Sequence, residues 1–226
     1  MLFRSALRLG AAHGYRAFEC DVKLSADGVP FLLHDATLER TSNGSGMAGQ
    51  QGWHSLSLLD AGGWHSRAYA GEPLATLAAI AAFVIANGFQ LNIEIKPTPG
   101  DELITGRVVA EQAARLWAGQ PAAPLLSSFS SAALAGARET APDLPRALLL
   151  DALSPGWQDQ ASALGCAAVV TQHRLMDASL LAQLRARQWW ALVYTVNEPA
   201  DAQRLLALGI DGLITDAVDR FPPASA

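Results

Sequence analysis

Two carboxylates separated by one residue stand in an otherwise apolar stretch, Phe18-Glu19-Cys20-Asp21-Val22. The stretch predicts a β-strand over 18–24, and strand side chains alternate faces, so Glu19 and Asp21 share one face. The apolar neighbours would then pack against other elements on the opposite face. Two like charges repel in a partly dry place, but a cation between them stabilises both. A solvated edge strand that carries two surface acids is the alternative interpretation.

A second stretch, Leu91-Asn92-Ile93-Glu94-Ile95-Lys96, repeats this polar and apolar alternation. Glu94 can join Glu19 and Asp21 as a third oxygen ligand, a set that suits Mg²⁺ or Ca²⁺. The set suits Zn²⁺ poorly, because cysteines and histidines at zinc-ligand spacings are missing from the sequence. Lys96 would bring positive charge for an anionic substrate such as a phosphate, although a salt bridge to Glu94 would explain this lysine as well.

His34 closes an apolar stretch, Val29 to His34, which an Asp27-Gly28 turn joins to the first carboxylate strand. Imidazole is the usual general acid or base near neutral pH, and this histidine lies close in sequence to the acidic residues. We therefore interpret His34 as catalytic, against the alternative of a core histidine bonded to a backbone carbonyl. The other histidines lack such neighbours and are interpreted as structural or surface residues: His13, His54, His65 and His173.

The elements that would position these side chains alternate along the chain. From Leu91 onward, short β-branched strands alternate with helical segments, which is typical of parallel βαβ units. Seven strands of this kind are predicted, at Glu19, Glu94, Ser127, Leu149, Val170, Thr195 and Ile214. No glycine-rich nucleotide-binding loop follows a strand, which disfavours a nucleotide-binding open sheet. We predict an α/β fold, a TIM-type (β/α)8 barrel one strand short of eight, preceded by a helix over Leu2 to Gly10.

Residues 35–73 interrupt the alternation of strands and helices. They combine many glycines with aromatic residues, and a loop this long in a compact domain is usually functional. We predict a small lid or subdomain, inserted after the first carboxylate strand, within a single domain spanning 1–226.

Composition excludes several classes of protein. Half of the 226 residues are apolar and 16% are charged, which excludes a disordered chain. The net charge of −5 and the lack of a basic run argue against nucleic acid as a partner. The longest mostly apolar run, 74–86, is shorter than the roughly 20 residues of a membrane span. Cys20 and Cys166 are predicted to be free thiols, which, without a signal-peptide pattern, favours a cytoplasmic protein.

Together these motifs resemble the glycerophosphodiester phosphodiesterase family. The resemblance covers nearly the whole chain, and its stretches run in the family's order. Besides the two carboxylate strands, it rests on Leu33-His34-Asp35, Thr37-Leu38-Glu39-Arg40-Thr41-Ser42-Asn43-Gly44, Ser127-Ser128-Phe129, Tyr194-Thr195-Val196-Asn197 and Asp211-Gly212-Leu213-Ile214-Thr215-Asp216. The family has a TIM barrel with an insertion, and residues 35–73 fall where that insertion belongs.

The resemblance implies a role for each of these side chains. Glu19, Asp21 and Glu94 would hold one divalent cation, Mg²⁺ or Ca²⁺. His34 would be one of two acid–base histidines, and Lys96 would contact the phosphate. The implied hydrolase cleaves a small-molecule glycerophosphodiester to glycerol 3-phosphate and an alcohol, a step of glycerol and lipid metabolism.

One part of the family pattern has no counterpart in the sequence. The family begins with a strand bearing His-Arg-Gly, followed closely by Glu-Asn-Thr, and neither motif occurs here. We therefore expect the first barrel strand, the second histidine and a phosphate-binding arginine to be missing, and turnover to be slow.

Two other functions stay open on the sequence alone. A non-catalytic phosphodiester- or metal-binding barrel would bind metal without turnover. A phospholipase-type barrel would need a basic or apolar patch facing a membrane, which the acidic composition disfavours.

Overall fold

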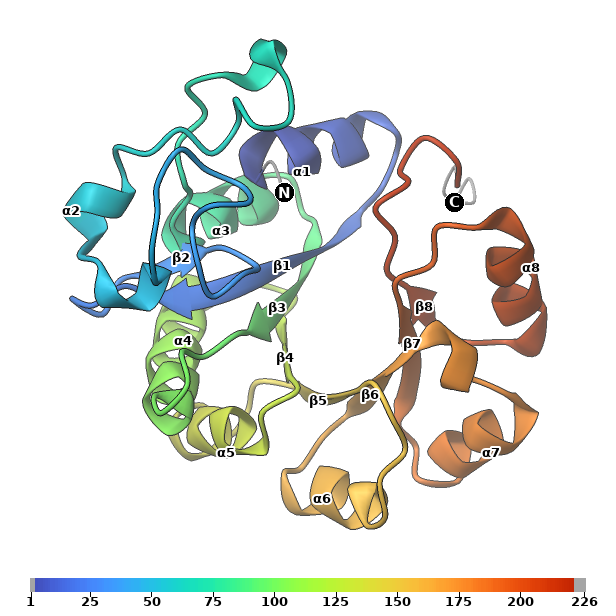
Figure 1. Ribbon diagram of the computed structural model, residues 1–226. Coiled ribbons are helices and arrows are strands. Elements are labelled where there is room, and N and C mark those ends of the chain that lie inside the picture. The colour runs from blue at the N-terminus through green and yellow to red at the C-terminus, as the bar shows by residue number, and fades with distance from the viewer. Residues whose placement is uncertain (1–2, 222–226) are drawn as a thin grey trace.

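The computed structural model describes residues 3–221 as one curved sheet with helices around it (Figure 1). The sheet has eight strands in the order β2-β1-β3-β4-β5-β6-β7-β8 within these residues, and only the β1–β2 pair is antiparallel. The strands are β1 (Ala17–Leu24), β2 (Pro30–Leu32), β3 (Gln90–Ile95), β4 (Leu125–Ser128), β5 (Arg146–Leu150), β6 (Ala168–Gln172), β7 (Trp190–Tyr194) and β8 (Gly212–Leu213). The seven parallel strands confirm the predicted incomplete α/β barrel.

The helices follow the strands in the βαβ order that the sequence predicts. They are α1 (Phe3–Ala12), α2 (Trp53–Leu56), α3 (Leu77–Ala86), α4 (Glu102–Leu116), α5 (Ser131–Thr140), α6 (Trp157–Ala163), α7 (Ala178–Ala186) and α8 (Pro199–Leu208). Leu2, with which we expected the first helix to begin, lies outside the described residues. In the described part of the chain, no helix combines the length and the apolar character that a membrane crossing requires.

Side-chain caps explain where several helices begin. The hydroxyl of Thr76 accepts a hydrogen bond from the backbone of Ala79 at the start of α3, and Ser130 does the same for α5. The sequence Asn197-Glu198-Pro199 predicts that Asn197 caps the last helix, with Pro199 in its first turn, but Glu198 occupies the cap position. The Asn197 amide instead accepts hydrogen bonds from Thr215 and Asp216, so it ties the end of β7 to the end of β8.

Alternation along the strands separates the barrel interior from the packing of the outer helices. Leu149 and Val170 face the interior, where they form a small apolar cluster with neighbouring alanines. Leu148 and Val169, which face the other way, belong to a larger core that includes Trp157 of α6. A second large core underlies β1 to β4 and the helices beside them. Cys20 and Cys166 are both free and buried, which confirms the prediction of free thiols.

Residues 35–73 pack closely against β2. Leu38 and Leu56 of this segment are fully buried in the same core as Phe31 of β2. The ring of Trp53 lies 5.9 Å from that of Phe31. The segment contains little regular structure besides α2 and lies over the β1–β2 hairpin (Figure 1). Its buried apolar side chains anchor it there.

The sheet is open between β1 and β8 within residues 3–221. Strand β2 pairs only with 22–24 of β1, so residues 17–20 have no partner strand on that edge. At the other end, the two-residue β8 pairs only with β7. The hydroxyl of Tyr15 donates to the backbone carbonyl of Phe221, a contact that links the start of β1 to the C-terminal segment.

Candidate active site

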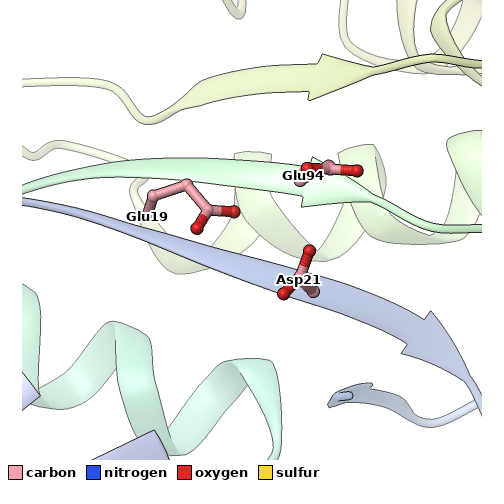
Figure 2. Close-up of side chains that lie close together, drawn as sticks. All are labelled: Glu19, Asp21 and Glu94. Carbon is pink, nitrogen blue, oxygen red and sulfur yellow. The ribbon is translucent and has the colours of Figure 1, made fainter. Parts of the chain in front are cut away.

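Three acidic side chains from two neighbouring strands converge inside the barrel (Figure 2). Strands β1 and β3 are parallel and in a register that sets Asp21 opposite Glu94. Glu19 lies two residues earlier on β1, so it shares the inward face with Asp21. One carboxylate oxygen from each of the three residues lies within 4.8 Å of the others. The strand alternation seen in the sequence therefore places all three side chains as predicted.

The carboxylates have few protein partners for their charge. Asp21 is buried, and its Oδ2 atom is shielded from solvent without a hydrogen bond, as is Oε1 of Glu19. Burial, together with repulsion from Asp21 and Glu94, raises the pKa of Glu19 well above its usual range. Burial also raises the pKa of Glu94, against the opposing effect of Lys96. Such a site disfavours three negative charges unless a further cation enters it.

Lys96 is the cation that the chain itself supplies to this cluster. Its Nζ atom lies 2.9 Å from Oε1 of Glu94 and 3.5 Å from Oδ1 of Asp21. Burial disfavours its charge, but these two carboxylates outweigh that effect and raise the pKa of Lys96. The salt bridge to Glu94 considered above is therefore present, and it holds the ammonium beside the carboxylates.

His34 lies two residues after the end of β2, the antiparallel neighbour of β1, and the backbone N–H of the preceding Leu33 donates to the carbonyl of Asp21. Its Nδ1 atom lies 2.7 Å from Oδ1 of Asp35, and its side chain is 51% exposed. The guanidinium of Arg40 holds Asp35 through Nε and Nη2, which lowers the pKa of Asp35 far below its usual range. With Nδ1 bonded to Asp35, the imidazole presents Nε2 for proton transfer.

Sequence reasoning gave no role to Asp35 or Arg40. Both occur in the stretches that carry the family resemblance, but a carboxylate next to a histidine in sequence contacts it only in some backbone conformations. The signal available in the sequence was the juxtaposition of His34 and Asp35. The position of Arg40, five residues further on, depends on the irregular path of the inserted segment.

Two aromatic side chains, one after β4 and one in β7, lie on the side of Lys96. Phe129, which follows β4, is 43% exposed and meets the ring of Tyr194 edge-on at 5.7 Å. The Nζ atom of Lys96 lies 5.9 Å from the centre of the Phe129 ring. The Tyr194 hydroxyl donates to the carbonyl of Leu150, and burial raises the pKa of Tyr194 to about 12. The sequence gave no role to this apolar wall beside the charged groups.

The donor set fits a hard divalent cation. Mg²⁺ and Ca²⁺ prefer oxygen ligands such as carboxylates. Oε1 of Glu19 and Oδ2 of Asp21 accept no hydrogen bond from the described residues, so both oxygens are available to a cation. No cysteine or histidine joins the cluster in the part of the chain that the structure describes. Chemically, the site can hold a cation, attract an anion through Lys96 and transfer a proton through His34.

Comparison with known proteins gives a consistent result. Residues 5–220 match the Glycerophosphoryl diester phosphodiesterase family. A glycerophosphodiester phosphodiesterase of Caldanaerobacter subterraneus subsp. tengcongensis is 28% identical over 219 residues, which cover 95% of this chain and 86% of that protein.

Solved structures of similar proteins share the fold. A phosphodiesterase from Oleispira antarctica, solved with the product sn-glycerol-3-phosphate, has a TM-score of 0.88 at 29% identity, covering 96% of this chain and 87% of that one. A glycerophosphodiester phosphodiesterase from Agrobacterium tumefaciens has a TM-score of 0.79 at 23% identity, covering 95% and 90%. These relatives are phosphoric diester hydrolases.

Proposed function

The chain belongs to the glycerophosphoryl diester phosphodiesterase family, and we propose that it hydrolyses glycerophosphodiesters to sn-glycerol 3-phosphate and an alcohol in a metal-dependent reaction. The observation that carries the proposal is the cluster of Glu19, Asp21 and Glu94, whose oxygens lie within 4.8 Å of one another beside a lysine ammonium. The product bound to the Oleispira antarctica relative supports a small-molecule phosphodiester as the substrate.

Glu19, Asp21 and Glu94 would hold one divalent cation, Mg²⁺ or Ca²⁺. When bound, such an ion neutralises the carboxylates and withdraws charge from a phosphoryl oxygen. The unpartnered oxygens of Glu19 and Asp21 support this assignment, because shielded carboxylate oxygens without partners are costly unless a cation completes them.

Lys96 would bind the phosphate. Its ammonium already lies between the carboxylates and the exposed ring of Phe129, so an anion at the barrel mouth would meet it directly. A charge-assisted hydrogen bond of this kind is about twice as strong as a neutral one.

His34 would transfer the proton, through Nε2, as general acid or base. Asp35 fixes its orientation, and Arg40 holds Asp35 in place. General acid–base help is typically worth about 10²–10⁴ in rate. The other histidines lie on different elements, in or after α1, α2 and β6 and in the inserted segment. We therefore expect the 226-residue chain, assayed alone, to hydrolyse glycerophosphodiesters slowly. His34 would act without the second acid–base histidine that the family resemblance implies.

Turnover of glycerophosphocholine and glycerophosphoethanolamine, followed by release of sn-glycerol 3-phosphate, tests the proposal. Activity should be lost in EDTA and return with Mg²⁺, Mn²⁺ or Ca²⁺. Added imidazole should increase the rate if a missing proton-transfer partner limits it. Metal binding without release of sn-glycerol 3-phosphate, with and without imidazole, would instead favour a non-catalytic binding barrel.

A further inference from the structure

The two lysines of the chain lie at the same level of neighbouring strands. The 16 basic residues comprise 14 arginines, Lys23 and Lys96. Because Val22 pairs with Ile95 in the parallel β1–β3 register, Lys23 and Lys96 are the next residues along the two strands. We propose that Lys23 is a positioning residue of the site, which holds the backbone of Lys96 and supplies the positive charge that an anionic substrate neutralises. The inference rests on the proposed function.

The contact that carries the inference is between Lys23 and the backbone of Lys96. The Nζ atom of Lys23 donates to the Lys96 carbonyl oxygen at 3.2 Å. The backbone N–H of Lys96 donates to the carbonyl of Val22 at 2.9 Å. Both backbone polar groups of Lys96 are therefore held by β1. This clamp fixes the residue whose ammonium must stay 2.9 Å from Glu94 and within reach of a phosphate.

The burial of Lys23 needs an explanation that its hydrogen bond alone does not give. The residue is 4% exposed, and the ion pairs of this region in residues 3–221 involve Lys96 and leave Lys23 out. A neutral amide could donate equally well to a carbonyl oxygen, whereas an ammonium without a paired carboxylate is expensive to bury. A buried charge at that position points to an electrostatic role in the site.

The charges around the site indicate what that role is. Asp35 and Arg40 neutralise each other, the charge of the exposed Asp216 near Glu19 is screened by solvent, and Glu19, Asp21 and Glu94 together balance Lys96 and one divalent cation. Without Lys23, the loaded site would be neutral before any substrate arrives. With Lys23, it carries one positive charge, which a phosphodiester monoanion neutralises. Lys23 would thus favour binding of the diester and oppose binding of the metal.

These opposite signs give a test that does not depend on turnover. Isothermal titration calorimetry measures the affinities for Mn²⁺ and, at saturating Mn²⁺, for sn-glycerol 3-phosphate. The Lys23→Met variant keeps the length of the side chain but loses its charge and its donor. We expect it to bind Mn²⁺ several-fold more tightly and sn-glycerol 3-phosphate about 10-fold more weakly, because the site loses one positive charge. Lys23→Arg should restore both affinities, and Arg8→Met, which removes an exposed charge on α1, should change neither.

A merely structural lysine would give a different result. If Lys23→Met weakens both affinities, or changes neither, the proposal is overturned. If Lys23→Met does not fold, as judged by circular dichroism, Lys23→Gln replaces it, because the shorter glutamine keeps a donor and lacks the charge. Lys23→Gln should still tighten Mn²⁺ binding, and an unchanged or weaker affinity would again overturn the proposal. A wild-type chain that releases no sn-glycerol 3-phosphate from diesters refutes the proposed function but leaves the Mn²⁺ titration intact as a test of Lys23.

Discussion

Replacing Glu19 by glutamine tests whether the buried charge of Glu19 destabilises the metal-free protein and is balanced only when a cation binds. The Oε1 atom of Glu19 is shielded from solvent and accepts no hydrogen bond among the described residues. Two carboxylates with oxygens no more than 4.8 Å apart repel by at least about 3.5 kcal/mol at an effective dielectric constant of about 20. Linkage gives a similar limit, because each unit of pKa shift is worth about 1.4 kcal/mol. From the ordinary pKa of 4.5 to pH 7, Glu19 can cost the metal-free protein at most about 3.4 kcal/mol.

The sign follows from the direction of the shift. The folded state raises the pKa of Glu19, so its contribution to stability is fully present below pH 4.5 and is lost as the pH rises toward the folded-state pKa. In EDTA, the free energy of unfolding of the wild type should fall with pH over this window. Glu19→Gln should remove most of that slope. Urea denaturation at pH 5, 6, 7 and 8 measures it, with Glu111→Gln on the exposed side of α4 as the matched control.

In EDTA at pH 7 and above, Glu19→Gln should be more stable than the wild type. Adding Mg²⁺ should make the wild type the more stable of the two proteins. The wild type gains stability because the ion binds only the folded state, and the gain grows with pH because the ligands must lose their protons. Glu19→Gln should gain little. Equal pH slopes for wild type and variant in EDTA, or an equal gain from Mg²⁺, would refute the reasoning that Glu19 is held for a cation.

Three further predictions concern the same site and the thiols. Glu94→Gln should abolish metal-dependent turnover and weaken metal binding in calorimetry, while the urea midpoint in EDTA changes little. A variant that binds the metal as tightly as the wild type would contradict this. His34→Asn should lower kcat about 10²–10⁴-fold, whereas Asp35→Asn, which acts through the orientation of His34, should lower kcat by about 10-fold with an unchanged KM. Cys20 and Cys166 should react with a thiol reagent only after unfolding, giving two thiols without reductant, and fewer than two would indicate an oxidised pair.

The strand pattern of the sequence predicted most of the fold and the acidic cluster. Alternation along two strands was enough to put Glu19, Asp21 and Glu94 on inward faces, because the period of a strand is two wherever it lies. Seven parallel strands occur as predicted, although β7 and β8 end one residue before Thr195 and Ile214. The helix cap at Asn197 failed because the same amide satisfies the end of β8, a contact between elements distant in sequence.

The roles of Asp35, Arg40 and Lys23 could not be predicted in this way. The contact between Arg40 and Asp35 depends on an irregular segment whose path is set by burial of Leu38 and Leu56, not by a repeating pattern. The sequence shows that Lys23 lies on the inward face of β1, but it does not show that the side chain is buried without a carboxylate partner.

The open edge between β1 and β8 changes how the fold holds together. In a closed ring every strand has two neighbours, so opening one contact leaves the others connected. In the arc formed by residues 3–221, strand pairing runs along a line from β2 to β8, as in a repeat protein whose stability is a sum of nearest-neighbour terms. Opening then starts at the ends of the line and costs least there. The acidic cluster joins β1 and β3, the second and third strands from one end of the sheet. An ion bound there would therefore stabilise the pairing of these strands against local opening, in addition to taking part in the reaction.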